Sequence, residues 1–141
     1  MNKKGLTVFE LLVTVGVFSF LATVMVPGLQ SFFVRMEIHA ALRTVTSALS
    51  VARYTAIRDN QPVQVVVVPG RIQLSVDNGQ GWQVSRIFAL DEKVSVRANG
   101  SPVFSPLGYV SPLCTITLQR QKRIFRVVLS MFGRVKVHDN G

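Results

Sequence analysis

The 141-residue sequence predicts an α+β protein, with one long N-terminal helix packed on an antiparallel β-sheet domain. Two patterns predict this fold. The first 58 residues carry apolar side chains at helical spacing, and the rest of the chain alternates short β-branched runs with Gly, Pro and Asn turns. The composition is 48% hydrophobic and 16% charged with a mean hydropathy of +0.35, which excludes a disordered chain and indicates contact with lipid.

The apolar excess is concentrated near the N-terminus. After Lys3 and Lys4, the chain has no charged residue between Glu10 and Arg35. A helix from Leu6 to Val26 would rise about 31 Å, close to the hydrocarbon thickness of a bilayer. A secretory signal peptide and a plain single-pass anchor are the alternatives. The length of the run, the lack of a small-x-small cleavage site and the carboxylate of Glu10 count against the signal peptide.

The residues around the start of this segment, Lys4-Gly5-Leu6-Thr7-Val8-Phe9-Glu10, resemble the class III leader of type IV pilins and type II secretion pseudopilins. The resemblance implies that a prepilin peptidase cuts after Gly5 and methylates the new amino group of Leu6. Glu10 then stands fifth in the mature chain, where the family has its glutamate. Pro27 stands twenty-second, where pilins commonly have a helix-kinking proline. Leu6 replaces the commoner Phe, and Val8-Phe9 replaces the usual Leu-Ile pair.

Glu10 places a carboxylate in an otherwise uncharged apolar segment, which is unfavourable unless the carboxylate has a partner. An unpaired carboxylate at membrane depth costs roughly 2 to 3 kcal/mol or more. When subunits stack into a filament, Glu10 of one subunit can meet the free N-terminal amine of its neighbour, which lowers the cost of both charges. We therefore predict that Glu10 is an assembly residue; a glutamate that snorkels to the membrane surface is the alternative.

The helix is expected to continue beyond the membrane segment. Pro27-Gly28 should bend or loosen the helix without ending it, because apolar residues continue at helical spacing. We predict one helix from about Thr7 to Arg58, with an amphipathic second half that lays one face on a sheet. The residues Asp59-Asn60-Gln61-Pro62 then end it.

A run of short strands follows Pro62, with Asn99 to Pro112 predicted as a loop. The predicted strands are residues 63–68, 71–76, 82–89, 94–98, a short one at 102–105, 114–118, 124–130 and 134–138. Together with the leader resemblance, this divides the chain into a leader peptide (1–5), a transmembrane and filament-core half-helix (6–34) and a periplasmic pilin-like globular domain (35–141).

Further motifs resemble the FimT/GspH group of minor pilins and minor pseudopilins, and they cover nearly the whole chain. In order, they are Ala48-Leu49-x-x-Ala52-Arg53-x-x-Ala56-Ile57, Gln61-Pro62-Val63, Gly81-Trp82 and Gly133-Arg134-Val135-Lys136-Val137. The resemblance implies a single-pass protein of the bacterial inner membrane that moves to a cell-surface pilus after assembly. Its implied partners are the prepilin peptidase and other major and minor pilins or pseudopilins.

Basic charge is concentrated in the last third of the chain. The whole chain has 16 Lys and Arg and 7 Asp and Glu, a formal net charge of +9. From Lys93 to the C-terminus there are eight Lys and Arg, and Asp139 is the single acidic residue. Side chains alternate along strands. The alternation is expected to place Arg126, Arg134, Lys136 and His138 on one exposed hairpin face, opposite Phe125, Val127, Leu129, Val135 and Val137.

The turn from Gln119 to Arg123 is expected to extend this basic face through Arg120, Lys122 and Arg123. A basic stripe on a sheet can hold a phosphate backbone with salt-sensitive, sequence-independent affinity. In FimT-type minor pilins linked to natural transformation, a C-terminal Gly-Arg-x-Arg motif is associated with DNA binding. The segment Gly133-Arg134-Val135-Lys136 resembles this motif, although Lys136 lacks the two-pronged geometry of arginine.

The resemblance therefore implies a minor type IV pilin that is incorporated in a pilus or primes it and binds double-stranded DNA for uptake. Its DNA-binding residues would be Arg120, Lys122, Arg123, Arg126, Arg134 and Lys136. A GspH-type minor pseudopilin of a type II secretion system is the alternative, as is a tip or priming subunit without DNA binding. The basic face would then be a solvated surface or would dock on an acidic neighbouring subunit.

The sequence offers no pattern for catalysis, metal binding or cofactor binding. It lacks a recognisable nucleophile–base pair, paired catalytic carboxylates, metal-ligand spacing and a glycine loop for phosphate, so we expect neither an enzyme nor a cofactor. Its single cysteine, Cys114, cannot form an intramolecular disulfide. We expect a buried thiol in a strand, with an intersubunit disulfide as the alternative.

Overall fold

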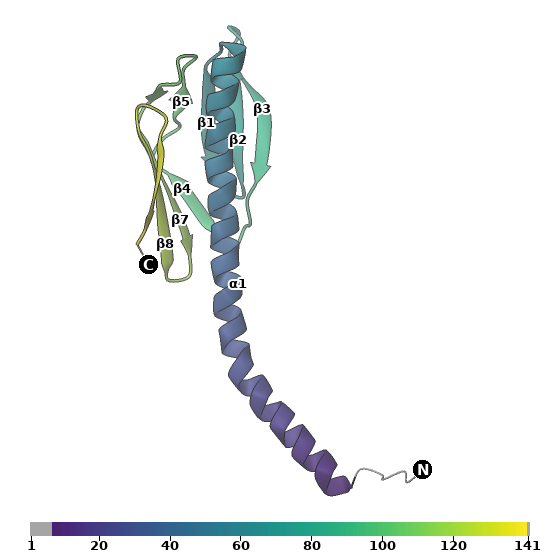
Figure 1. Cartoon of the computed structure of the whole chain (residues 1–141). Helices are drawn as coiled ribbons and strands as arrows, with labels where there is room; N and C mark the ends of the chain where they lie inside the picture. Colours follow the sequence, from purple (N-terminus) through teal and green to yellow (C-terminus); the bar gives the residue numbers. More distant parts are fainter. Residues whose placement is uncertain (1–6, 141) are drawn as a thin grey trace. The chain divides into compact units, whose positions relative to one another are not determined.

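The computed structural model describes residues 7–140, except for the side chains of Val26 and Pro27. One helix, α1 (Val8–Asp59), is followed by the strands β1 to β9 (Figure 1). The chain divides into two compact units, Met1–Arg35 and Met36–Gly141, and α1 runs through both. The predicted leader, with Gly5 and Leu6, lies outside the described residues.

Within the first unit, α1 exposes apolar side chains on all sides and is long and apolar enough to cross a membrane. Its hydroxyl groups bond back to the helix: Thr14 Oγ1 donates to the Glu10 carbonyl at 2.6 Å, and Ser19 Oγ donates to the Val15 carbonyl at 2.8 Å. Such internal bonds satisfy polar groups that lipid could not. The helix continues through Pro27, as predicted, and its bounds agree with the prediction to one residue.

The second unit contains two antiparallel sheets. The first sheet has the order β3-β2-β1-β5-β6, with bounds β1 (Val63–Val68), β2 (Arg71–Asp77), β3 (Trp82–Ala89), β5 (Val103–Phe104) and β6 (Val110–Ser111). The second sheet has the order β4-β7-β8-β9, with bounds β4 (Ser95–Ala98), β7 (Cys114–Arg120), β8 (Arg123–Leu129) and β9 (Val135–Asp139).

The predicted loop from Asn99 to Pro112 contains one strand more than expected. In it, β6 pairs with β5 through Val103↔Ser111 and Phe104↔Val110. A strand of two residues is too short to show the alternation on which sequence-based prediction depends.

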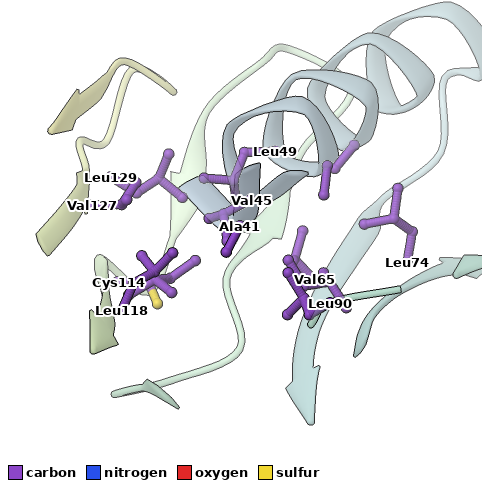
Figure 2. Close-up of a cluster of buried hydrophobic side chains, with 14 of the residues drawn as sticks. Ala41, Val45, Leu49, Val65, Leu74, Leu90, Cys114, Leu118, Val127 and Leu129 are labelled. Atoms are coloured by element: carbon purple, nitrogen blue, oxygen red, sulfur yellow. The ribbon is translucent and has the colours of Figure 1, made fainter. Parts of the chain in front are cut away.

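The second half of α1 packs on both sheets and forms one core with them (Figures 1 and 2). Its buried residues, among them Ala41, Val45 and Leu49, repeat at helical spacing. Val65 and Leu74 of the first sheet meet this stripe, as do buried residues of the second sheet that include Leu118, Val127 and Leu129. The predicted amphipathic half-helix and α+β architecture are confirmed.

Candidate functional site

The candidate site is the outer face of the second sheet, which points away from the core. Strand register aligns Arg97 with Thr117, Thr117 with Arg126, and Arg126 with His138, so these four residues form one row across all four strands. A second row runs from Thr115 through Val128 to Lys136. Directly paired residues share a face, so the cations of both rows lie together.

This outer face carries a single sign of charge. Arg97, Arg126, Lys136 and His138 are all exposed. Among the strand residues of the second sheet, all of which the structure describes, neither Asp nor Glu lies on the outer face by register. A shallow cavity of about 430 Å³ lies between the cations, lined by Arg97, Ala98, Asn99, Thr115, Thr117 and Arg126.

Asn99 shapes one end of this cavity. Its side-chain oxygen Oδ1 accepts a hydrogen bond of 2.8 Å from the backbone N–H of Thr115. This hydrogen bond fixes the segment that follows β4 against the backbone of β7, and so it holds the floor of the cavity in place. Thr117 of β7 stands between Arg97 and Arg126 of the neighbouring strands, whereas Thr115 lies between Asn99 and Val128.

Arg134 lies at the edge of the outer face, in the turn between β8 and β9. The backbone N–H of Arg134 donates to Ser130 Oγ at 3.1 Å, and the Ser130 N–H donates to the Arg134 carbonyl at 3.0 Å. Gly133 is buried with φ +70°, and a Cβ there would lie 3.2 Å from Arg53 Cδ and from the Gly108 carbonyl oxygen. The glycine therefore lets this turn pack on α1 and fixes the position of the Arg134 backbone.

The structure places two of the predicted residues on the opposite face. Arg120 and Arg123 are directly paired at the ends of β7 and β8, and by alternation they lie on the side of Leu118 and Phe125, which face the core. The prediction that they extend the exposed basic face was wrong. The strands run to the two-residue turn Gln121–Lys122, so the alternation continues further than the sequence suggested. Lys122 itself lies in that turn.

Arg120 instead forms an ion pair that the sequence analysis missed. Its Nε donates to Glu37 Oε2 of α1 at 2.9 Å, with side chains 25% and 20% exposed, and Lys93 Nζ approaches Glu37 Oε1 at 3.3 Å. One carboxylate thus joins α1 to the end of β7 and to the segment before β4. No sequence signal relates Glu37 to these cations, because they are 56 and 83 residues away along the chain.

In β9, the charged residues are exposed as the alternation predicts, but the apolar residues are less buried than it predicts. Lys136 and His138 lie on the outer face as expected, and Val135 is half-buried. Val137, expected to be buried, is 44% exposed. The reason is that β9 is an edge strand, so half of its inner face lacks a neighbouring strand.

Glu10 lies far along the chain from this face and has a local role that the sequence analysis missed. The Glu10 backbone N–H donates to Thr7 Oγ1 at 3.2 Å, and the Thr7 N–H donates to Glu10 Oε2 at 3.1 Å. These reciprocal bonds form a capping box at the start of α1. The Thr-x-x-Glu spacing of residues 7–10 was the available signal.

Cys114 is a buried free thiol at the start of β7, as predicted. Its Sγ lies 3.4 Å from the Gly100 carbonyl oxygen. Burial raises the pKa of the Cys114 thiol, because the thiolate is poorly solvated there.

Comparison with known proteins identifies the family. The family model described as type II transport protein GspH matches residues 41–133, which is 93 of the 141 residues. A search of curated proteins finds no significant match to this sequence. The matched range ends at Gly133 and so excludes Arg134 and Lys136.

Solved structures share the fold at low sequence identity. The minor pseudopilin EpsH from the type 2 secretion system of Vibrio cholerae is 16% identical with a TM-score of 0.63, over 74% of this chain and 98% of that chain. The type IV minor pilin FimU of Pseudomonas aeruginosa is 14% identical with a TM-score of 0.63, over 76% and 92%. The chain belongs to the GspH family of minor pilins and minor pseudopilins, a family of structural subunits.

Proposed function

We propose that this chain is a minor pilin that is incorporated in a type IV pilus or primes it, and that its outer face binds double-stranded DNA without sequence preference during DNA uptake. The observation that supports this function is the row from Arg97 through Arg126 to His138, with Lys136 beside it, on a sheet face free of carboxylates. Such a surface attracts a polyanion.

The size of the outer face suits a DNA backbone. Strands lie about 4.8 Å apart, so β4 to β9 spans roughly 14 Å. Phosphates of one DNA strand advance about 3.4 Å along the duplex axis, so about four of them fit this span. The hydroxyls of Thr115 and Thr117 can donate to phosphate oxygens between the cations, which is a common way to position a backbone.

The residues that we now propose as DNA contacts differ from those expected from the sequence. Arg126, Arg134 and Lys136 remain, and Arg97 joins them through the register of β4 with β7. Arg120 leaves the set because Glu37 holds its guanidinium on the other face. Arg123 leaves it because it is paired with Arg120 across the hairpin.

The test measures the binding of the full chain in non-ionic detergent to a fluorescent DNA duplex by anisotropy. Four neutralised phosphates give a log–log salt slope of roughly −3 to −4, and Arg134→Ala with Lys136→Ala should reduce it by about two. The control, Arg71→Ala with Arg86→Ala, removes the same charge from the first sheet and should preserve the slope better. Absence of binding at low salt, or equal effects of both double variants, refutes the proposal.

The proposed life cycle of the chain begins at the inner membrane. The prepilin peptidase cuts after Gly5 and methylates Leu6, α1 anchors the chain, the globular domain lies in the periplasm, and Glu10 meets the N-terminal amine of a neighbouring subunit during assembly. Mass spectrometry should then find a methylated N-terminus at Leu6. An uncut N-terminus in assembled filaments refutes this sequence of events. Glu10→Gln should allow cleavage and reduce incorporation into the filament.

A second candidate, a GspH-type minor pseudopilin of a type II secretion system, is favoured by the description of the matching family model. In that case, the partners are other pseudopilins and the basic face contacts one of them. Deletion of the gene decides between the two functions. Loss of protein secretion with normal DNA uptake supports the pseudopilin, and loss of DNA uptake with normal secretion supports the pilin.

A further inference from the structure

Two turns of the second unit have the same construction. The turns Ser105–Tyr109 and Ser130–Arg134 both have the pattern Ser-x-x-Gly-x, with glycine at φ +82° and +70°. In each, the first N–H donates to the last carbonyl, at 2.8 and 3.0 Å, and the serine hydroxyl accepts a bond from the last N–H, at 3.2 and 3.1 Å.

The two turns lie against one another and against the end of α1. The Val110 N–H donates to the Met131 carbonyl at 2.8 Å, which joins the segments. A Cβ on Gly108 would lie 3.3 Å from Ile57 Cδ1 of α1, and one on Gly133 would lie 3.2 Å from the Gly108 carbonyl oxygen. The glycines therefore allow the first turn to approach Ile57 and the second turn to approach Arg53 and the first turn.

The turn tips expose apolar side chains where turns usually carry polar ones. Leu107 is 81% exposed and Phe132 is 58% exposed, and the Tyr109 and Phe132 rings lie 6.1 Å apart. The twin-turn surface is defined as Ile57, Leu107, Tyr109, Met131 and Phe132, all exposed. Contiguous exposed apolar side chains of this kind mark interaction sites.

The border of the twin-turn surface is basic. Arg53 and Arg134 flank it, and residues 53–57, 105–109 and 130–134 include neither Asp nor Glu. An apolar centre with a positively charged rim fits a partner with an apolar patch edged by carboxylates. Two copies of this surface would not fit each other, because their arginines would meet.

We propose that the twin-turn surface docks a different pilin-class subunit of the same filament, through an apolar patch edged by carboxylates on that subunit. Membership of a family of minor pilins and minor pseudopilins suggests another subunit of this class as the partner of this surface. The proposal rests on the proposed role as a filament subunit but does not depend on DNA binding, with which it shares only Arg134. Apolar side chains such as Leu107 and Met131 gain little from contact with phosphates.

The test is photo-crosslinking of the full chain in cells that assemble the filament, with p-benzoylphenylalanine at Leu107 or Phe132. Ile87 on β3 is the matched control position, because it is apolar and 53% exposed on the first sheet. We expect crosslinks from both turn positions to another subunit whose precursor has a prepilin leader, in yields about tenfold above Ile87. Crosslinks to a second copy, to phospholipid or to DNA, or yields equal to those at Ile87, overturn the proposal.

Charge and apolar variants test the two parts of the surface separately. Arg53→Glu with Arg134→Glu should reduce the crosslink from Leu107 by about tenfold, while Arg71→Glu with Arg86→Glu should leave it unchanged. Leu107→Ser with Met131→Ser should lower the number of filaments by about tenfold. The control for this comparison is Val84→Ser with Ile87→Ser on the first sheet. Native Trp82 fluorescence is expected in all variants. Equal effects of either pair and its control overturn the proposal.

Discussion

Gly133→Ala is expected to destabilise the second unit through two separable effects. The left-handed backbone at φ +70° costs an L-residue about 1–2 kcal/mol. The new Cβ would also lie 3.2 Å from Arg53 Cδ and from the Gly108 carbonyl oxygen, closer than ordinary van der Waals contact. Such overpacking costs about 1–3 kcal/mol. Together these effects predict a loss of about 2–5 kcal/mol in the free energy of unfolding.

Gly79→Ala is the matched control. Gly79 has φ +84°, and a Cβ there has no described heavy atom within 4 Å apart from its chain neighbours, so this substitution adds the backbone cost alone. Urea unfolding of the full chain in detergent, followed by Trp82 fluorescence, measures both variants. Trp82 is the single tryptophan and lies in β3, so the signal reports on the second unit. Gly133→Ala should exceed Gly79→Ala by about 1 kcal/mol or more.

The source of the extra cost is tested by combining Gly133→Ala with Arg53→Ala. Removing the Arg53 side chain relieves one of the two close contacts and leaves the one with the Gly108 carbonyl. The loss in the free energy of unfolding of the double variant should therefore be smaller than the sum of the losses of the two single variants, by about 0.5–1 kcal/mol. Equal losses for Gly133→Ala and Gly79→Ala would refute the reasoning, because the close approach of the turn to α1 would then contribute nothing.

Three further predictions concern the core, the ion pair and the thiol. Ile116→Ala should lower the free energy of unfolding by about 2–5 kcal/mol because Ile116 is buried, while Thr117→Ala on the outer face should change it by no more than about 0.5 kcal/mol, both by urea unfolding. Glu37→Gln should cost about 1 kcal/mol in the same measurement, because Arg120 loses its charged acceptor and the pair is partly screened by solvent. Cys114 should react with iodoacetamide at pH 8 far more slowly in the native chain than in urea, as followed by mass spectrometry. Because its folded-state pKa is raised, the unfolded thiol ionises first, and the free energy of unfolding should fall as the pH rises past the ordinary thiol pKa.

The sequence predicted most of the fold because its patterns are long and regular. The helical spacing of Val45, Leu49 and Ala56 sets the face of α1 that is buried, and the alternation of Phe125, Val127 and Leu129 sets the inner face of β8. The Gly-rich and Pro-rich segment before Cys114 gave less information. Its strands β5 and β6 have two residues each. β5 depends on β1, which is distant in sequence, and β6 depends in turn on β5.

The candidate site was predictable in part for the same reason. Arg126, Lys136 and His138 followed from alternation, which register then confirmed. Arg97 was counted as a cation but could not be assigned to the site, because its place depends on the pairing of β4 with β7. Arg120 was assigned to the wrong face because its partner, Glu37, is 83 residues away in the chain.

The capping box at the start of α1 has a consequence for the assembly contact that we propose for Glu10. The Glu10 carboxylate is already bonded to the Thr7 N–H before any neighbour arrives. In the proposed assembly, the amine of a neighbouring subunit would therefore meet a carboxylate that already accepts a hydrogen bond from its own chain and still has acceptor sites left. Under that proposal, Thr7 would orient the carboxylate for its neighbour, and a chain lacking the Thr7 hydroxyl would lose the bond from the Glu10 N–H that completes the cap.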